Sequence, residues 1–198
     1  MNGFESRKQR KNESIRQAAL ELFKTYGFKK VSINDIAHKA GVSQVTIYNH
    51  FGSKQELVRD VVKTLFTSMI DKYRAIINGE GSFTEKLESI VFDKTEIASH
   101  FQGQLTQALF QSDPEMEHFV DDWWKKDVVP LTIDLIEKGK NEGYINPELS
   151  REVLLLYLSL LRSGVSARPD LLANVKPNIK LYRELNYIFL YGMMGKKE

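Results

Sequence analysis

Apolar residues recur every three or four positions along most of the chain, which is the spacing of amphipathic α-helices. The first such stretch runs from Lys11 to Tyr26 and ends at Gly27. A longer one, Lys54–Ile77, has an apolar face of double width and therefore needs packing partners on two sides. No stretch alternates convincingly with the period of two of a half-buried strand. The pattern predicts an all-α fold of about nine helices.

Helix start and stop signals divide the remainder of the chain. Residues 5–11 are polar and basic, and we expect them to form an arm outside the first helix. Pro130 should kink the helix that contains it, because its ring removes an internal hydrogen bond. A run of apolar residues, Val153–Leu161, is hydrophobic nearly all round and is expected to be buried on most sides. Beyond a loop at residues 78–82, helices are predicted at Thr84–His100, Gln104–Gln111, Asp113–Glu142, from Ser150 to the break at Arg168-Pro169, and at Pro177–Met194.

Two short helices joined by a glycine occupy Ser32–Lys54. Ser32 can cap the first of them, and Asp35 stands three residues later as in a capping box. Gly41 follows this helix, where a chain often needs a positive φ, and Ser43 can cap the next. This layout is that of a helix-turn-helix.

The second short helix, Gln44–Phe51, has one apolar and one polar side. Ile47 and Phe51 are four residues apart and share the side expected to be buried, whereas Val45 and Asn49 point nearly opposite. The first helix of the chain, with apolar positions Ile15, Ala18, Ala19, Leu22, Phe23 and Tyr26, would support this pair and complete a three-helix head.

Charge is distributed unevenly behind a net value of +2. Residues 1–54 hold ten lysines and arginines against four acidic residues, so the rest of the chain is mildly acidic. A basic head on an acidic body is typical of a protein that binds phosphates with one part only. Basic termini also occur in proteins that never touch nucleic acid, so charge alone does not decide the matter.

The string IAHKAGVSQVTIYNHFGSKQEL, which begins at Ile36, resembles the DNA-binding signature of TetR-type transcriptional regulators, the tetracycline-repressor family. The resemblance implies a helix-turn-helix DNA-binding domain over residues 1–53 and a ligand-binding and dimerisation domain over 54–198. It also implies a dimer on a palindromic operator, released by a small, largely apolar effector. The residues that match are Ile36, Ala37, Ala40, Gly41, Val42, Ser43, Thr46, Ile47, Tyr48, Phe51, Lys54 and Leu57.

Read onto the matching signature, the second short helix is a recognition helix for the major groove. The residues that it would present to the major groove are Gln44, Val45, Thr46, Tyr48, Asn49 and His50. For His50, packing against the Lys54–Ile77 helix is an alternative to a DNA contact. Gln44 and Asn49 suit adenine, and Val45 suits a thymine methyl group. Phosphate contacts would come from Ser32, Ser43, Tyr48 and Lys54. Val45 and Asn49 depart from the commonest family pattern, so the operator sequence cannot be carried over from a relative.

The resemblance also implies a pocket in the body and a dimer interface near the C-terminus. Aromatic walls with a few polar groups would form the pocket, although aromatic residues at helical spacing are more often plain core. Its candidate residues are Tyr73, Phe101, Gln104, Gln107, Phe110, Trp123, Trp124, Tyr157 and Arg162. The last two apolar helices would meet their copies in a four-helix bundle through Leu154, Leu158, Leu161, Leu181, Leu185, Ile188 and Gly192.

The remaining chemistry is sparse. The chain has no cysteine, its four histidines lack ligand spacing, and no Ser/His/Asp grouping accompanies a nucleophile elbow. His118, Asp121 and Asp122 share a helical face, but a solvated acidic face explains them better than a metal site. We therefore predict no enzyme activity, no metal and no cofactor. No signal peptide or membrane span is evident, which makes the cytoplasm the expected location.

A ligand-responsive repressor is the function that these observations favour. Two alternatives remain at this point. One is an activator, or a regulator controlled by a protein instead of a small molecule. The other is a helical enzyme or scaffold that carries a vestigial head.

Overall fold

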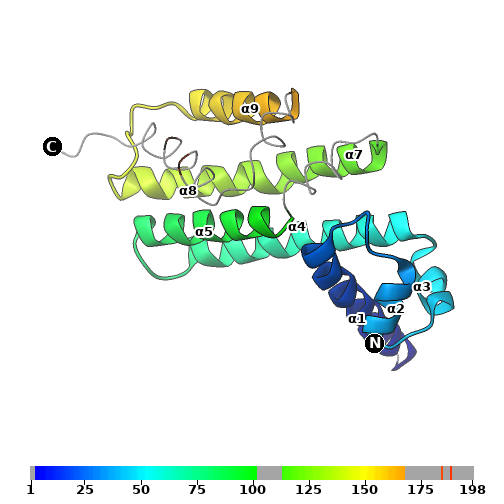
Figure 1. Cartoon of the computed structure of the whole chain (residues 1–198). Helices are drawn as coiled ribbons and strands as arrows, with labels where there is room; N and C mark the ends of the chain where they lie inside the picture. The colour runs from blue at the N-terminus through cyan, green and yellow to red at the C-terminus, as the bar shows by residue number, and fades with distance from the viewer. Residues whose placement is uncertain (1–2, 102–112, 168–183, 185–187, 189–198) are drawn as a thin grey trace. The chain divides into compact units, whose positions relative to one another are not determined.

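The computed structural model describes residues 3–101 and 113–167, together with Glu184 and Ile188. Every regular element in these ranges is helical, as the sequence predicted (Figure 1). No helix of the described part is long and apolar enough to cross a membrane. The elements are α1 (Gly3–Tyr26), α2 (Ile33–Ala40), α3 (Gln44–Phe51), α4 (Lys54–Asn78), α5 (Phe83–Phe101), α7 (Pro114–Trp123), the π-helix η1 (Trp124–Val128), α8 (Val129–Asn141) and α9 (Arg151–Ala167).

The chain divides into two compact units, residues 1–68 and residues 69–198. The boundary falls inside α4, so this one helix belongs to both units. The division that we predicted between residues 53 and 54 concerns function, and it stays a prediction. The predicted helices Gln104–Gln111 and Pro177–Met194 lie outside the described residues, apart from Glu184 and Ile188, which are helical.

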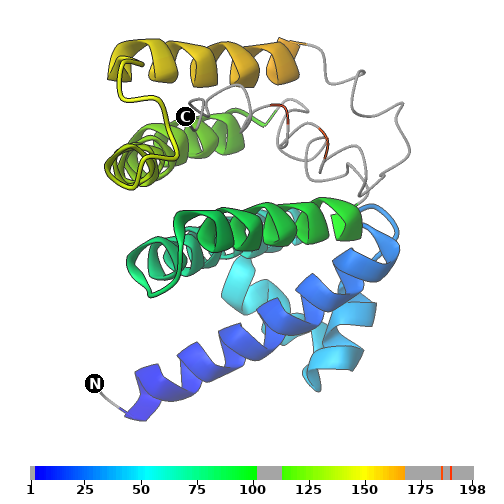
Figure 2. The same ribbon diagram turned by 90° about the vertical axis from the view of Figure 1, so that its left-hand side faces the viewer.

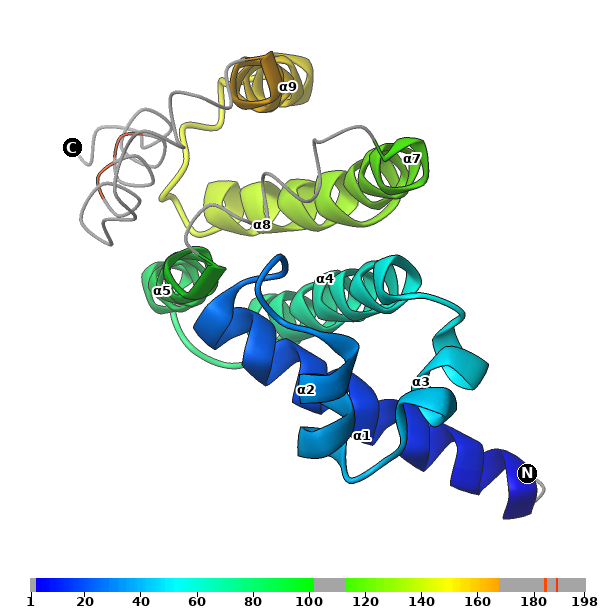
Figure 3. The ribbon, with the colours of Figure 1, turned by 45° about the vertical axis from the view of Figure 1, so that its right-hand side comes forward.

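The first unit is built around α1, with α2 and α3 packed beside it (Figure 3). Its core consists of apolar side chains from α1, α2, α3 and the first half of α4, and from the loop after α1. The buried members are Ile15, Ala18, Ala19, Phe23, Phe28, Val31, Ile33, Ile36, Ala37, Ile47, Leu57, Val61 and Val62. Phe23 and Phe28 meet with ring centroids 4.9 Å apart, which fixes the loop against the helix that it leaves.

Two expectations about α1 are wrong. Residues 5–11, expected to form an arm, are the first turns of the helix, which begins at Gly3. Their polar side chains give no apolar periodicity, so the pattern could not place them in a helix. Tyr26, expected on the apolar side, is 59% exposed because it stands at the end of the helix, beyond the core.

The second unit joins the end of α4 to α5, α8 and α9. Figures 1 and 2 show α5 alongside the second half of α4. One apolar cluster links α4, α5 and α8 through Ile70, Tyr73, Ile77, Ile90 and Leu131. Another links α5, α8 and α9 through Phe83, Leu87, Ile136, Ile145 and Leu154. The double-width apolar face predicted for α4 is thus used in both units, since Leu57, Val61 and Val62 are buried in the first.

The predicted helix from Asp113 to Glu142 is present as continuous helical backbone, and its middle is a π-helix. Asp113 caps α7 and Pro114 stands at its first position, as predicted. The backbone then widens into the π-helix η1 directly before Pro130, whose missing N–H cannot continue an α-helical ladder. Gly143, with φ of 75°, follows the end of α8.

Candidate functional site

The turn between α2 and α3 is built from local hydrogen bonds. The backbone N–H of Asp35 donates to the Ser32 hydroxyl oxygen at 3.1 Å, and the Ser32 backbone N–H donates back to the Asp35 carboxylate at 2.8 Å. Hydrogen bonds from Ser32 lower the pKa of Asp35 below its ordinary value. Gly41 adopts φ of 65°, the left-handed region where glycine is favoured, and Ser43 caps α3 by accepting from the Thr46 N–H. The predicted capping box and glycine turn are confirmed.

One side of α3 is buried and the other faces solvent. Ile47 is completely buried, whereas Val45 is 65% exposed and Tyr48 is 48% exposed. Gln44 and Asn49 are exposed as well, and Thr46 is half-buried. Four of the side chains that we predicted for the major groove, those of Gln44, Val45, Tyr48 and Asn49, are therefore exposed. A two-turn helix that presents this face has the shape and chemistry of a major-groove reader.

The side chain of Gln44 is held in place on this face by a hydrogen bond. Its side-chain amide donates to the side-chain oxygen of Asn34 in α2 at 2.9 Å, and both residues are exposed. The bond leaves the Gln44 carbonyl oxygen and one amide hydrogen available for a base. Asn34 is a site residue that the sequence analysis missed. An exposed asparagine in α2 gives no sequence signal until the turn brings it opposite Gln44.

The predicted phosphate contacts differ in what they can offer. The Ser32 hydroxyl donates to the Asp35 carboxylate at 2.6 Å, so its single hydrogen is engaged beside a negative charge, which disfavours a phosphate there. Ser43 shares a hydrogen bond with the Thr46 hydroxyl at 2.9 Å. Lys54 stands at the first position of α4 and reaches the backbone oxygen of Lys29 at 3.4 Å, a long bond that a phosphate could replace.

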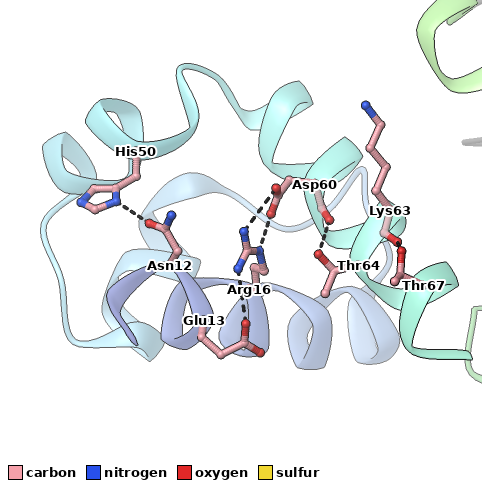
Figure 4. Close-up of polar contacts among 8 residues, drawn as sticks. All are labelled: Asn12, Glu13, Arg16, His50, Asp60, Lys63, Thr64 and Thr67. Carbon is pink, nitrogen blue, oxygen red and sulfur yellow. Dashed lines mark hydrogen bonds and ion pairs between the residues drawn. The ribbon is translucent and has the colours of Figure 1, made fainter. Parts of the chain in front are cut away.

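His50 faces α1 with one of its ring nitrogens. Its Nδ1 atom is hydrogen-bonded to the side-chain oxygen of Asn12, which ties the end of α3 to α1 (Figure 4). His50 is half-buried, and this bond to α1 is a contact that the sequence analysis did not predict for it. Asn12 was not predicted, because 38 positions separate it from His50 in the sequence.

A groove between α1 and α3 lies next to this hydrogen bond. It is lined by Arg7, Lys8, Arg10 and Lys11 from α1 and by Asn49 and His50 from α3, and we call it the α1–α3 groove. The four basic side chains are exposed. A predicted base-reading residue, Asn49, therefore shares a surface with four cations that were expected in an arm.

An ion pair within the first unit joins α1 to α4. The Arg16 guanidinium contacts both carboxylate oxygens of Asp60, at 2.5 and 3.4 Å (Figure 4). Its hydrogen bond with Asp60 raises the pKa of Arg16, which is charged in any case. Because Asp60 lies less than two turns after Lys54, this pair fixes the start of α4 against the helix that supports α3.

The residues that we predicted to line an effector pocket, where the structure describes them, lie in different environments. Tyr73 is buried in the core of the second unit, and Trp123 packs against the same cluster. Trp124 begins the π-helix and is half-buried, while Tyr157 is 39% exposed on α9. The side chains of Phe101, Gln104, Gln107, Phe110 and Arg162 lie outside the described residues.

A buried carboxylate accompanies Tyr73. Asp93 of α5 is only 7% exposed and forms an ion pair with Lys72 of α4. Burial, and then the nearby charge of Asp93, raise the pKa of Tyr73 well above its ordinary value, so its hydroxyl remains protonated. The sequence analysis missed Asp93, although an acidic residue three positions after Ile90 on an apolar face was a usable signal.

The residues predicted for the dimer interface differ in how exposed their side chains are. Leu154 is 3% exposed and packs against an apolar cluster of its own chain, which leaves little of its side chain for a second copy. Leu158 is half-buried, Leu161 is 44% exposed and Ile188 is 64% exposed. Leu181, Leu185 and Gly192 lie outside the described residues. The expectation that the apolar run of α9 is buried on most sides does not hold within one chain, since it also exposes Val153, Leu156 and Leu160.

Residues 15–61 match the family model described as bacterial regulatory proteins, tetR family. The matched stretch begins in α1 and ends in α4, and it contains the whole helix-turn-helix with its buried and exposed faces. The sequence resemblance and the structural features of the first unit thus point to the same family.

Relatives extend the similarity to the second unit. The chain is 29% identical to the uncharacterized HTH-type transcriptional regulator YvdT of Bacillus subtilis (strain 168), over 93% of this chain and 95% of YvdT. It is 24% identical to the HTH-type transcriptional repressor KstR2 of Mycobacterium tuberculosis (strain ATCC 25618 / H37Rv), over 75% of this chain and 76% of KstR2. These relatives are named as regulators and not as enzymes.

A solved structure shares the fold. The transcriptional regulator FadR from Bacillus subtilis, in complex with stearoyl-CoA, matches with a TM-score of 0.62 over 91% of this chain and 98% of FadR. The sequence identity of 19% makes this a statement about architecture.

Proposed function

Because the chain belongs to the TetR family of transcriptional regulators, we propose that it is a repressor that binds a palindromic operator as a homodimer. We further propose that a small, largely apolar effector releases it from DNA. The observation that carries the proposal is the exposed polar face of α3, which is held on a buried Ile47 and placed by caps at Ser32 and Ser43. An exposed face of this kind suits the base edges of a major groove.

The exposed apolar stripe of α9 supports the dimer. Val153, Leu156 and Leu160 are 54%, 60% and 61% exposed, and their spacing places them on one side of the helix. Monomeric proteins rarely leave a contiguous apolar face of this kind in water. A second copy related by two-fold symmetry would cover it and would present two recognition helices to a palindrome. Leu161 and Ile188 would join this interface, but Leu154 would not.

Two features of relatives and of the chain support an apolar effector. FadR of Bacillus subtilis was solved with stearoyl-CoA, a ligand with a long apolar chain. In this chain the interior of the second unit is apolar around Tyr73, with Asp93 as a polar group beside it. An effector that binds beside these residues would therefore be apolar with one polar group.

The route from effector to DNA would run through α4. This helix starts with Lys54, directly after the recognition helix, and ends at Asn78 within the second unit. An effector that binds one position of α4 better than another would shift the population of head positions and so the affinity for the operator. The functional division between residues 53 and 54 and a location in the cytoplasm belong to the same proposal.

Selection of bound duplexes from random DNA tests the proposal. We expect enrichment of a short palindrome whose half-sites are about one helical turn apart, roughly 34–36 Å. Binding that depends on salt but enriches no sequence would contradict a role as an operator-specific regulator.

A further inference from the structure

The basic residues at the start of α1 are fixed beside the recognition helix. Arg7, Lys8, Arg10 and Lys11 lie in the first turns of a continuous helix, and all four line the α1–α3 groove with Asn49 and His50. Among the first twelve residues of the chain, Glu5 is the single acidic one. The groove therefore carries a strong positive charge at the side of α3 where Asn49 lies.

The Asn12–His50 hydrogen bond sets the position of these cations. Lys8 precedes Asn12 by four residues, so the two lie on the same side of α1, one turn apart. Asn12 in turn holds His50 at the last turn of α3. A basic segment that is already helical loses less conformational entropy on binding than a loose arm would lose.

We propose that Arg7, Lys8, Arg10 and Lys11 bind the phosphates of the DNA backbone that flanks the bases read by α3. The inference rests on the proposed function, since it assumes that α3 faces DNA. Arginine and lysine are the residues that contact phosphates most often, and such contacts fix the register of a reader without selecting bases. The α1–α3 groove thus extends the DNA-binding surface beyond the helix-turn-helix. Neither Ser32 nor the capped turn supplies comparable charge.

The proposal predicts a measurable dependence on salt. Each phosphate neutralised by a protein cation contributes about 0.9 to the slope of log K against log salt concentration on duplex DNA. In a homodimer, Arg10→Gln/Lys11→Gln removes two contacts from each copy and should therefore lower the magnitude of this slope by about 3.6. Glutamine has nearly the helix propensity of lysine and arginine, so α1 should remain intact, which circular dichroism can verify.

The matched control removes one arginine and one lysine from the second unit. Arg151 and Lys125 are both exposed, and Lys125→Gln/Arg151→Gln should leave the slope as in the wild type. Each protein is measured on the selected operator and on a random duplex of the same length. We expect the α1 variant to weaken binding to both duplexes by the same factor, and to lose hydroxyl-radical protection of sugars at the outer edge of each half-site.

The outcomes separate this inference from the proposed function. If the wild type selects an operator but the α1 variant keeps the slope and the outer protection of the wild type, the inference is wrong and the proposed function stands. An equal drop in slope for both double variants would also overturn it, because net charge and not the groove would be responsible. If the α1 variant instead changes the preferred base at one position, the groove reads bases and the assignment to phosphates fails.

Discussion

Asn12 of α1 and His50 of α3 are joined by a hydrogen bond between the Asn12 side-chain oxygen and the His50 Nδ1 atom (Figure 4). An amide oxygen can only accept, so Nδ1 of His50 carries the hydrogen. The bond holds the last turn of the recognition helix against the helix that supports it. It also places the basic start of α1 beside Asn49. Two polar residues far apart in sequence therefore help to position the surface that we propose faces DNA.

We predict that Asn12→Ala and His50→Ala are coupled. Each substitution should lower operator affinity, because either one frees the end of α3. The double variant should be no worse than the more damaging single variant. The coupling energy should be about 1 kcal/mol, as for an ordinary net hydrogen bond. A double-mutant cycle measured by fluorescence anisotropy on the operator checks this. Strictly additive losses would show that the two side chains act independently.

Lys54→Ala should weaken binding to all duplexes alike. Its ammonium group makes one long contact, with the Lys29 backbone oxygen at 3.4 Å, and stands at the start of α4, where the helix dipole also attracts phosphate. Losing one phosphate contact in each copy of the homodimer should lower the salt slope by about 1.8. Titrations at several salt concentrations measure the slope, with Lys125→Ala as a control in the second unit. A slope equal to that of the control would remove Lys54 from the interface.

Local signals in the sequence were sufficient for the helix-turn-helix. The cap at Ser32, the glycine at 41 and the cap at Ser43 each follow from residues within four positions of one another. Contacts between distant polar side chains were not predictable, and Gln44–Asn34 and Asn12–His50 are of this kind. These contacts depend on how the helices pack against one another. An exposed asparagine in the sequence does not indicate which residue of another helix it will face.

The second unit shows the same limit for apolar patterns. The run in α9 indicated a helix, but the pattern alone could not separate Leu154, which packs in its own core, from Leu156 and Leu160, which do not. An apolar residue that packs in the core of its own chain and one that packs against a second copy give the same helical spacing in the sequence. The π-helix before Pro130 was anticipated only as a kink, because proline indicates where a helix is disturbed and not how the backbone adapts.

Asp35→Asn should make the stability of the first unit less sensitive to acid. The pKa of Asp35 is lowered in the folded chain by its hydrogen bonds with Ser32, so the ionised form stabilises α2. This contribution is present above the unfolded pKa, near 3.8, and is lost as the pH falls through the lower folded value. Urea unfolding at pH 7 and at pH 3 should show a stability difference between wild type and variant that shrinks at pH 3. A constant difference would assign the effect to something other than ionisation.

Gly139→Ala should destabilise the second unit. A Cβ atom at this buried position of α8 would lie 2.7 Å from Phe83 and 2.8 Å from the Cδ1 atom of Ile145. Overpacking costs about 1–3 kcal/mol, while replacing glycine in a helix returns at most about 1 kcal/mol, so a net loss is expected.

A second substitution tests the packing explanation for Gly139. Ile145→Val removes the Cδ1 atom that the new methyl group would meet, and alone it should cost about 0.5–1.5 kcal/mol. Combined with Gly139→Ala, it should cost less than the sum of the two single changes. Urea denaturation gives all four values. Additive losses would mean that crowding against Ile145 is not the cause.

The specificity of Asn49→Ala tests the central claim most directly, namely that the exposed face of α3 reads bases. The affinities of the wild type and the variant are measured on the selected operator, on every single-base-pair substitution of one half-site, and on random duplex. Removing the amide should relax the preference at one base pair, where discrimination of about 1–3 kcal/mol is lost, and should leave the affinity for random duplex unchanged. An equal loss on operator and random duplex, with the base preferences intact, would contradict the account.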